Sequence, residues 1–196
     1  MLMNASTTHT MHLSIAEKGK LKALKGNHKE ALKYYREALR LAVSSRAPEI
    51  FFRHYTQCVL ESLELTGSYD EIIEYCINAD AHYASLNLNS SIHRRDRGSI
   101  LERQGLVQLK KGDIDNARLA LQQAREIAGE KVLPVTEEVL NWLKRGFSVD
   151  ASRILGSQRK HHYFVVRAEQ VSRERAKSFS TAKHTGFFDP SQVLSG

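Results

Sequence analysis

The sequence has few of the residues that usually stabilise small secreted domains or turn-rich β folds. Among 196 residues it has 2 cysteines, 3 prolines and 11 glycines. Two cysteines cannot form a disulfide framework, so we expect Cys58 and Cys76 to be reduced and at least partly buried. The scarcity of proline and glycine argues against a sandwich or barrel with many tight turns.

Long apolar runs are also missing. No window of the chain approaches the roughly 20 apolar residues that a membrane-spanning helix needs. The start, MLMNASTTHTMHLS, has no basic segment followed by an apolar stretch, which argues against a signal peptide. With the reduced cysteines, these features predict a cytoplasmic protein with no membrane span.

Motifs for catalysis and metal binding are lacking too. The sequence contains no phosphate-binding loop, no H-E-x-x-H, no calcium loop and no C-x-x-C pair. His54 and Cys58 are spaced for one helix face, but no third residue orients the histidine. His161 and His162 are adjacent, so their rings point apart and lack further ligands. We therefore expect no enzyme activity, no metal and no cofactor.

One pattern is present three times. The segments read LKGNHKEALKYYREALRLA from Leu24, LTGSYDEIIEYCINADAHYA from Leu65 and KKGDIDNARLALQQAREIA from Lys110. Glycine ends helices in the left-handed conformation, and Asn, Ser or Asp caps the helix that follows. Each segment therefore predicts a tight helix–turn–helix, with the turn at Gly26–Asn27, Gly67–Ser68 and Gly112–Asp113.

The helix after each turn carries an apolar stripe. Steps of 3, 4 and 3 residues place four side chains on one helix face. Small residues in this stripe let a neighbouring helix approach closely. The stripes are His28, Ala31, Tyr35 and Ala38; Tyr69, Ile72, Cys76 and Ala79; and Ile114, Ala117, Leu121 and Ala124.

At these residues the chain resembles tetratricopeptide repeat (TPR) proteins, in which helical hairpins stack into a solenoid. Gly19 and Gly105 match the small residue seven positions before the turn glycine, whereas Leu60 departs from it. The turn glycines are 41 and 45 residues apart, against a usual repeat of about 34. Longer repeats of this kind resemble those of kinesin light chains and bacterial peptide-sensing regulators.

The resemblance covers residues 12–146 and implies an all-α fold. We expect a right-handed α-solenoid of three TPR-like hairpins, closed by a capping helix at 135–145 that Pro134 opens. Residues 1–11 should be a flexible N-terminus. Residues 147–196 should form a basic, partly disordered or partner-docked tail, with a short strand within 157–167 and a basic helix within 168–180.

Charge is distributed unevenly around the net value of +7. Residues 12–46 hold nine Lys and Arg against three Glu, whereas residues 47–90 hold one Arg against seven Asp and Glu. The asymmetry suits either a solvated surface or selection of a charged partner.

In the TPR family the first helices of the hairpins line a concave groove, and the resemblance implies the same here. The carboxylate clamp of chaperone adaptors is absent, because its asparagine positions hold Lys20 and Glu61. Glutamates in the groove should instead favour a basic or amphipathic peptide. The candidate groove residues are Lys20, His54, Gln57, Glu61, Glu64, Glu102 and Arg103.

These features predict a non-enzymatic adaptor or scaffold that binds a peptide or helix, while its tail recruits a second partner or regulates the groove. Two alternatives stay open: a nucleic-acid-associated factor whose tail contacts phosphates, and a self-assembling scaffold that forms a homo-oligomer. The candidate contact residues of the tail are Arg159, Lys160, Tyr163, Phe164, Arg173, Arg175, Phe187 and Phe188.

Overall fold

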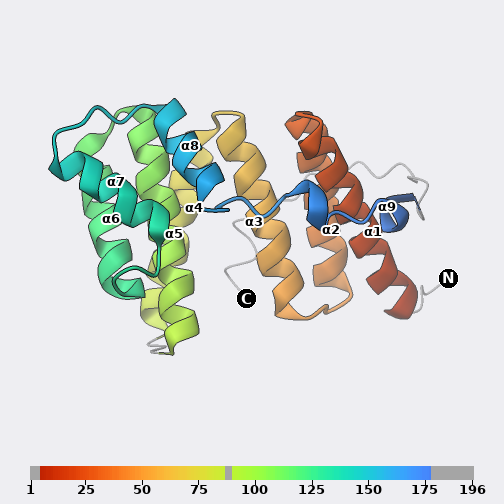
Figure 1. Ribbon diagram of the computed structural model, residues 1–196. Coiled ribbons are helices and arrows are strands. Elements are labelled where there is room, and N and C mark those ends of the chain that lie inside the picture. Colours follow the sequence, from red (N-terminus) through yellow and green to blue (C-terminus); the bar gives the residue numbers. More distant parts are fainter. Residues whose placement is uncertain (1–4, 87–89, 178–196) are drawn as a thin grey trace. The chain divides into compact units, whose positions relative to one another are not determined.

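The computed structural model describes residues 5–86 and 90–177, which are helical with no strand, so the all-α prediction is confirmed (Figure 1). The described residues form nine α-helices and one 3-10 turn. These are α1 (Ala5–Leu24), α2 (His28–Ser44), α3 (Glu49–Leu65), α4 (Tyr69–Ser85), α5 (Ser91–Lys111), α6 (Ile114–Ala128), α7 (Pro134–Lys144), α8 (Ala151–Lys160), η1 (Ala168–Gln170) and α9 (Arg173–Lys177).

The chain divides into two compact units. The first unit joins Met1–Gly67 to Val165–Gly196, and the second is Ser68–Phe164. Helices α1, α2, α3 and α9 therefore belong to the first unit, and α4 to α8 belong to the second. Residues 165–177 lie with helices about a hundred positions earlier in the sequence.

The three predicted turns have the expected backbone. Gly26, Gly67 and Gly112 have φ values of 75°, 79° and 87°, in the left-handed region that favours glycine. The Asn27 side chain accepts a hydrogen bond from the Glu30 amide, and Asp113 accepts one from the Asn116 amide, each at 3.3 Å. Ser68 makes no side-chain cap hydrogen bond, so two of the three predicted caps form.

The predicted small residues sit where two helices of a hairpin meet. A methyl group on Gly19 would lie 2.6 Å from the Tyr35 ring on α2, and one on Gly105 would lie 2.6 Å from Leu121 on α6. These distances are too short for any side chain. Glycine therefore permits the close packing of α1 on α2 and of α5 on α6.

The last three residues of each predicted stripe are buried. Ala31, Tyr35 and Ala38 are fully covered in the first unit, and their equivalents on α4 and α6 are covered in the second. The first stripe residue differs, since Ile114 is half exposed and His28 is partly exposed. Each is the first residue of its helix, so it lies at the edge of the packed face.

Both cysteines are buried thiols outside any disulfide, as predicted. Burial is the main reason that the pKa of the Cys58 thiol is raised to about 12. At that value the thiol stays protonated and unreactive near neutral pH.

The second unit ends with two helices that cover the α5–α6 hairpin. Pro134 is the first residue of α7, so this helix begins and ends one residue before the predicted 135–145. Glu102 of α5 accepts hydrogen bonds from the amide and the hydroxyl of Thr136, at 3.0 and 2.8 Å. Since Leu133 offers no side-chain cap, Glu102 supplies the cap from a neighbouring helix.

The short strand expected within 157–167 does not form, because residues 151–160 are helix α8. The Asp150 side chain caps this helix by accepting the Arg153 amide at 2.7 Å. Ile154 is fully buried against a cluster that includes Leu106 and Leu121. Local capping and one buried apolar side chain thus favour a helix over a strand.

Polar contacts fasten α8 to α7. Glu138 of α7 accepts hydrogen bonds from Ser157 at 2.7 Å, Lys160 at 2.9 Å and His161 at 3.0 Å. Desolvation would raise the pKa of Glu138, but these three donors outweigh it and lower that pKa to about 2. The carboxylate is therefore charged at all ordinary pH values.

Candidate functional site

The first unit has charged side chains buried on one face formed by α1 and α3. Glu17 and Lys20 of α1 are each 8% exposed, and Glu61 and Glu64 of α3 are 4% and 2% exposed. Charged groups at such positions need partners, because burial without them is costly. Lys20 donates to Glu17 at 2.8 Å, which satisfies one carboxylate oxygen.

Further partners of Glu61 and Glu17 come from residues 165–172. The amides of Val165 and Val166 both donate to Oε2 of Glu61, at 2.8 and 3.1 Å. The amide of Ser172 donates to Oε2 of Glu17 at 2.7 Å. Three backbone N–H groups of one segment are therefore held by two buried carboxylates, and hydrogen bonds to charged acceptors are the stronger kind.

Figure 1 shows this segment crossing α3 and ending in α9 beside α1. The backbone is extended at Arg167 (φ −128°, ψ 143°) and at Val171 (φ −100°, ψ 123°), on either side of η1. The N–H groups of an extended chain do not form the internal hydrogen bonds that they would form in a helix. Here the carboxylates of Glu61 and Glu17 accept hydrogen bonds from three of these N–H groups. We call residues 165–177 the docked segment and the surface under it the α1–α3 face.

Apolar contacts hold the docked segment at two points. Val166 is 8% exposed and Ala176 is 4% exposed. Between these points, Ala168, Glu169 and Gln170 of η1 are exposed to solvent. The segment is therefore anchored near both ends and at Ser172, whereas η1 is exposed to solvent.

The predicted histidine–cysteine pair lies on α3 in the same unit. The Nε2 atom of His54 is 3.8 Å from the Cys58 sulfur. Burial, with Lys20 as a second cause, lowers the pKa of His54 to about 4, so the imidazole is neutral near pH 7. A neutral imidazole beside a thiol whose pKa is about 12 is not an activated nucleophile.

A second pair of contacting side chains has one member on α1 and the other on α3. Nδ1 of His12 and the hydroxyl of Tyr55 are 2.7 Å apart, and both side chains are buried. Burial, the largest cause, raises the pKa of Tyr55 above its ordinary value. This pair joins α1 to α3 and positions the two helices that carry the acidic residues.

The predicted groove residues divide between the two units. Lys20, His54, Gln57, Glu61 and Glu64 lie in the first unit, whereas Glu102 and Arg103 lie on α5 in the second. Glu102 and Arg103 are about 5% and 4% exposed. Contacts within the second unit involve both residues, so their role toward a partner stays a prediction.

The predicted tail residues also have different surroundings. In the second unit, Lys160 pairs with Glu138, and the guanidinium of Arg103 lies 5.0 Å from the centre of the Tyr163 ring. The rings of Tyr163 and Phe164 are 5.2 Å apart, edge to face. Arg159 is exposed at the end of α8, and Arg173 and Arg175 are exposed on α9. Phe187 and Phe188 lie outside the described residues.

Sequence reasoning missed five residues of this site. Glu17 shares a helix face with the predicted Lys20, so its spacing of three positions was an available signal. Val165, Val166, Ser172 and Ala176 have no such signal, because the first three act through backbone N–H groups, which every non-proline residue has.

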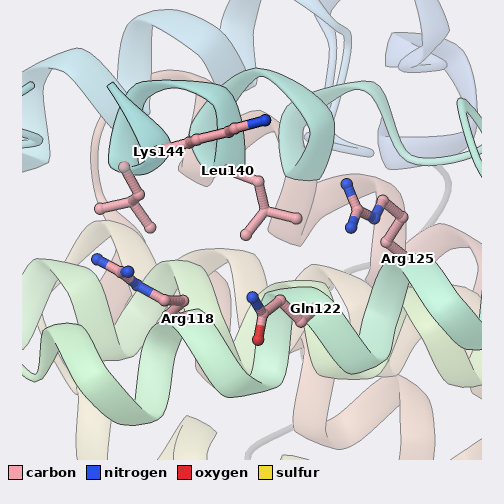
Figure 2. A pocket seen from close by; sticks show the side chains of 6 residues that line it. Arg118, Gln122, Arg125, Leu140 and Lys144 are labelled. Atoms are coloured by element: carbon pink, nitrogen blue, oxygen red, sulfur yellow. The ribbon is translucent and has the colours of Figure 1, made fainter. Parts of the chain in front are cut away.

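The second unit contains a cleft between α6 and α7, with a volume of about 280 Å³. In Figure 2, Leu140 points from α7 toward Gln122 of α6, with Arg118 and Arg125 on either side. The Nη1 atom of Arg125 lies 4.0 Å from the Oε2 atom of Glu137. The long side chains of Arg118, Arg125 and Lys144 line the cleft together with Leu140 and Leu143. The apolar stems of arginine and lysine commonly pack on such apolar surface.

Two further kinds of feature are absent from the described residues. No group of three or more His, Cys, Asp or Glu side chains in residues 5–86 and 90–177 is arranged to hold a metal ion. Within the same ranges, no helix combines the length and the apolar character needed to cross a membrane.

Comparison with family models, with curated proteins and with solved structures found no match to this chain.

Proposed function

We propose that this protein is a non-enzymatic, cytoplasmic interaction adaptor whose α1–α3 face captures an extended peptide. In this proposal the helical hairpins belong to a right-handed TPR-like solenoid, and the docked segment occupies the face in place of a partner. The observation that carries the proposal is the pair of successive amides, Val165 and Val166, held by the single carboxylate of Glu61.

The chemistry of the face suits a polypeptide backbone. Buried carboxylates require N–H donors, and an extended peptide offers one at every residue except proline. Any apolar group could pack against the face, but only a group with N–H donors can bind Glu61 and Glu17 as well. In the structure these donors are main-chain amides. A face that binds main-chain donors tolerates varied side chains, which is a useful property for an adaptor.

The charge of the docked segment supports the predicted preference for basic peptides. Residues 165–177 hold four Lys and Arg against two Glu. The face beneath them has Glu17 and Glu61, which bind the segment, against Lys20, which pairs with Glu17. Opposite charges steer a basic peptide toward an acidic face and increase its association rate.

A competition experiment on the full chain tests the proposal. The Val166→Asp substitution puts a carboxylate where Val166 is buried and beside Glu61, so it should release the docked segment. The matched control is Ala168→Asp, which adds the same charge at an exposed position of the same segment. The probe is a fluorescent peptide with the sequence of residues 163–177, and fluorescence anisotropy measures its binding.

We expect the probe to bind the Val166→Asp chain at least tenfold more tightly than the wild type or the control. A segment attached to the same chain competes at a high effective concentration, and only its release makes the face available. A Glu61→Lys substitution added to Val166→Asp should abolish binding. Equal affinity for the wild type, the control and Val166→Asp would contradict the proposal.

No specific observation favours either of the two alternatives. A nucleic-acid role for the tail requires free basic and aromatic side chains, but Lys160 is ion-paired and the Tyr163 ring packs against the core of the second unit.

A further inference from the structure

We infer that the α1–α3 face selects its peptide partners by the pattern that the docked segment displays. The inferred partner is a basic peptide that is extended at its start and helical after the position of Ser172, with a buried apolar residue at the position of Val166. A serine or threonine follows six positions later, at Ser172, and a small residue follows ten positions later, at Ala176. This inference rests on the proposed function and specifies its partner.

The hydrogen bonds set the direction in which the peptide lies. Glu61 of α3 holds the N-terminal end of the docked segment through Val165 and Val166. Glu17 of α1 holds a residue further along, through the amide of Ser172. A partner that uses both carboxylates must therefore run from α3 to α1 and cannot have proline at any of these three positions.

Burial identifies the position of Val166 as an apolar subsite. Val166 is covered, whereas its neighbours Val165 and Arg167 are only partly covered. A charged side chain here would be desolvated beside the buried carboxylate of Glu61, which is costly for an aspartate. The subsite should therefore accept valine, isoleucine or leucine and reject acidic residues.

The position of Ser172 makes two hydrogen bonds at once. Its amide donates to Glu17 at 2.7 Å, and its side-chain oxygen accepts from the amide of Arg175 at 3.3 Å, which caps α9. Threonine preserves both contacts. Aspartate is normally a good cap, but here it would place a second carboxylate next to Glu17, so the site should discriminate against it.

The position of Ala176 requires a small side chain. Ala176 is almost fully buried, and its helix, α9, packs on α1. A large residue would overfill this contact and push α9 away from α1. In contrast, Glu169 lies in the exposed turn between the anchors and should be replaceable by any residue that permits the turn.

A set of peptides tests the pattern against the full-length Val166→Asp chain, whose face is expected to be open. All peptides span residues 163–177 and are compared by fluorescence anisotropy. The peptides with Ser172→Thr and Glu169→Ala should bind within threefold of the unchanged peptide. Those with Val166→Asp, Ser172→Asp, Ser172→Pro or Ala176→Trp should bind at least tenfold more weakly.

The result separates a failure of the pattern from a failure of the proposed function. If every peptide binds with similar affinity, the face captures peptides but the inferred pattern is wrong. If no peptide binds the open chain, the proposed function is wrong and the pattern with it. A second open chain, full-length Ser172→Pro, repeats the test in case the Val166→Asp chain does not fold, as judged by circular dichroism.

Discussion

The pKa of His54, on α3, is strongly shifted by its surroundings in the folded protein. Burial first, and then the charge of Lys20, lowers the pKa of this histidine from 6.5 to about 4, while Glu17 acts in the opposite direction. In the unfolded chain the same imidazole takes up a proton near pH 6.5. The folded protein therefore contains a neutral histidine that the unfolded protein would protonate in mild acid.

This difference predicts a pH dependence of stability. Between pH 6.5 and about 4 the unfolded state binds more protons, so the free energy of unfolding should fall as the pH decreases through this range. Allowing for the part of the side chain that water reaches, we expect a loss of about 1 kcal/mol between pH 7 and pH 5. His28, whose pKa burial also lowers, adds to the same trend.

Urea unfolding of the wild type and of His54→Gln at pH 7 and pH 5 measures the effect. The substitution should decrease the loss of stability between the two pH values. An identical loss in both proteins would show that His54 is not the responsible group.

At the residue scale, the resemblance to TPR proteins placed Lys20, His54 and Glu61 among the groove positions, and their role toward a partner stays a prediction. Their partners were not predictable in the same way, because Glu61 binds the amides of Val165 and Val166, a hundred positions away. Amides are present at nearly every residue, so no sequence pattern marks the ones that are used.

At the scale of helices, close packing at glycine is the feature most sensitive to substitution. A methyl group at Gly105 would lie 2.6 Å from Leu121 and 3.0 Å from a backbone oxygen of α6, and one at Gly19 would meet the Tyr35 ring. Gly156 of α8 has no heavy atom within 4 Å of the equivalent position. The three glycines therefore allow a direct comparison of the same substitution.

We expect Gly19→Ala and Gly105→Ala to lower the free energy of unfolding by about 1–3 kcal/mol, because each overfills a tight helix contact. Gly156→Ala should leave it unchanged or raise it by about 0.5–1 kcal/mol, since alanine favours a helix over the unfolded chain. Urea denaturation curves provide the comparison. Similar effects at all three sites would contradict the close packing of the two hairpins.

The helices themselves were predictable where pattern and turn signals agreed. The turns at Gly26, Gly67 and Gly112 formed as expected, as did a helix opened by Pro134. The sequence analysis did not predict helix α8, because its sequence is mostly polar. Ile154 is its one buried apolar residue. Its stability comes from contacts with α7, and sequence periodicity does not report such contacts.

At the scale of the whole molecule, residues 165–177 return to the first unit. Residues 165–177 belong with α1, α2 and α3, although residues 68–164 form a compact unit of their own. A sequence predicts such a return poorly, because the docked segment has neither a repeat nor an apolar stripe. Its basic charge opposite an acidic face was the only available signal.

Two buried carboxylates, Glu61 and Glu17, hold the docked segment through its amides. Hydrogen exchange measured by nuclear magnetic resonance on the full chain tests it most directly. We expect slow exchange at Val165, Val166 and Ser172, fast exchange at the exposed Ala168, and loss of protection at Val165 and Val166 in a Glu61→Lys chain. Fast exchange at all three amides in the wild type would show that Glu61 and Glu17 do not hold the docked segment.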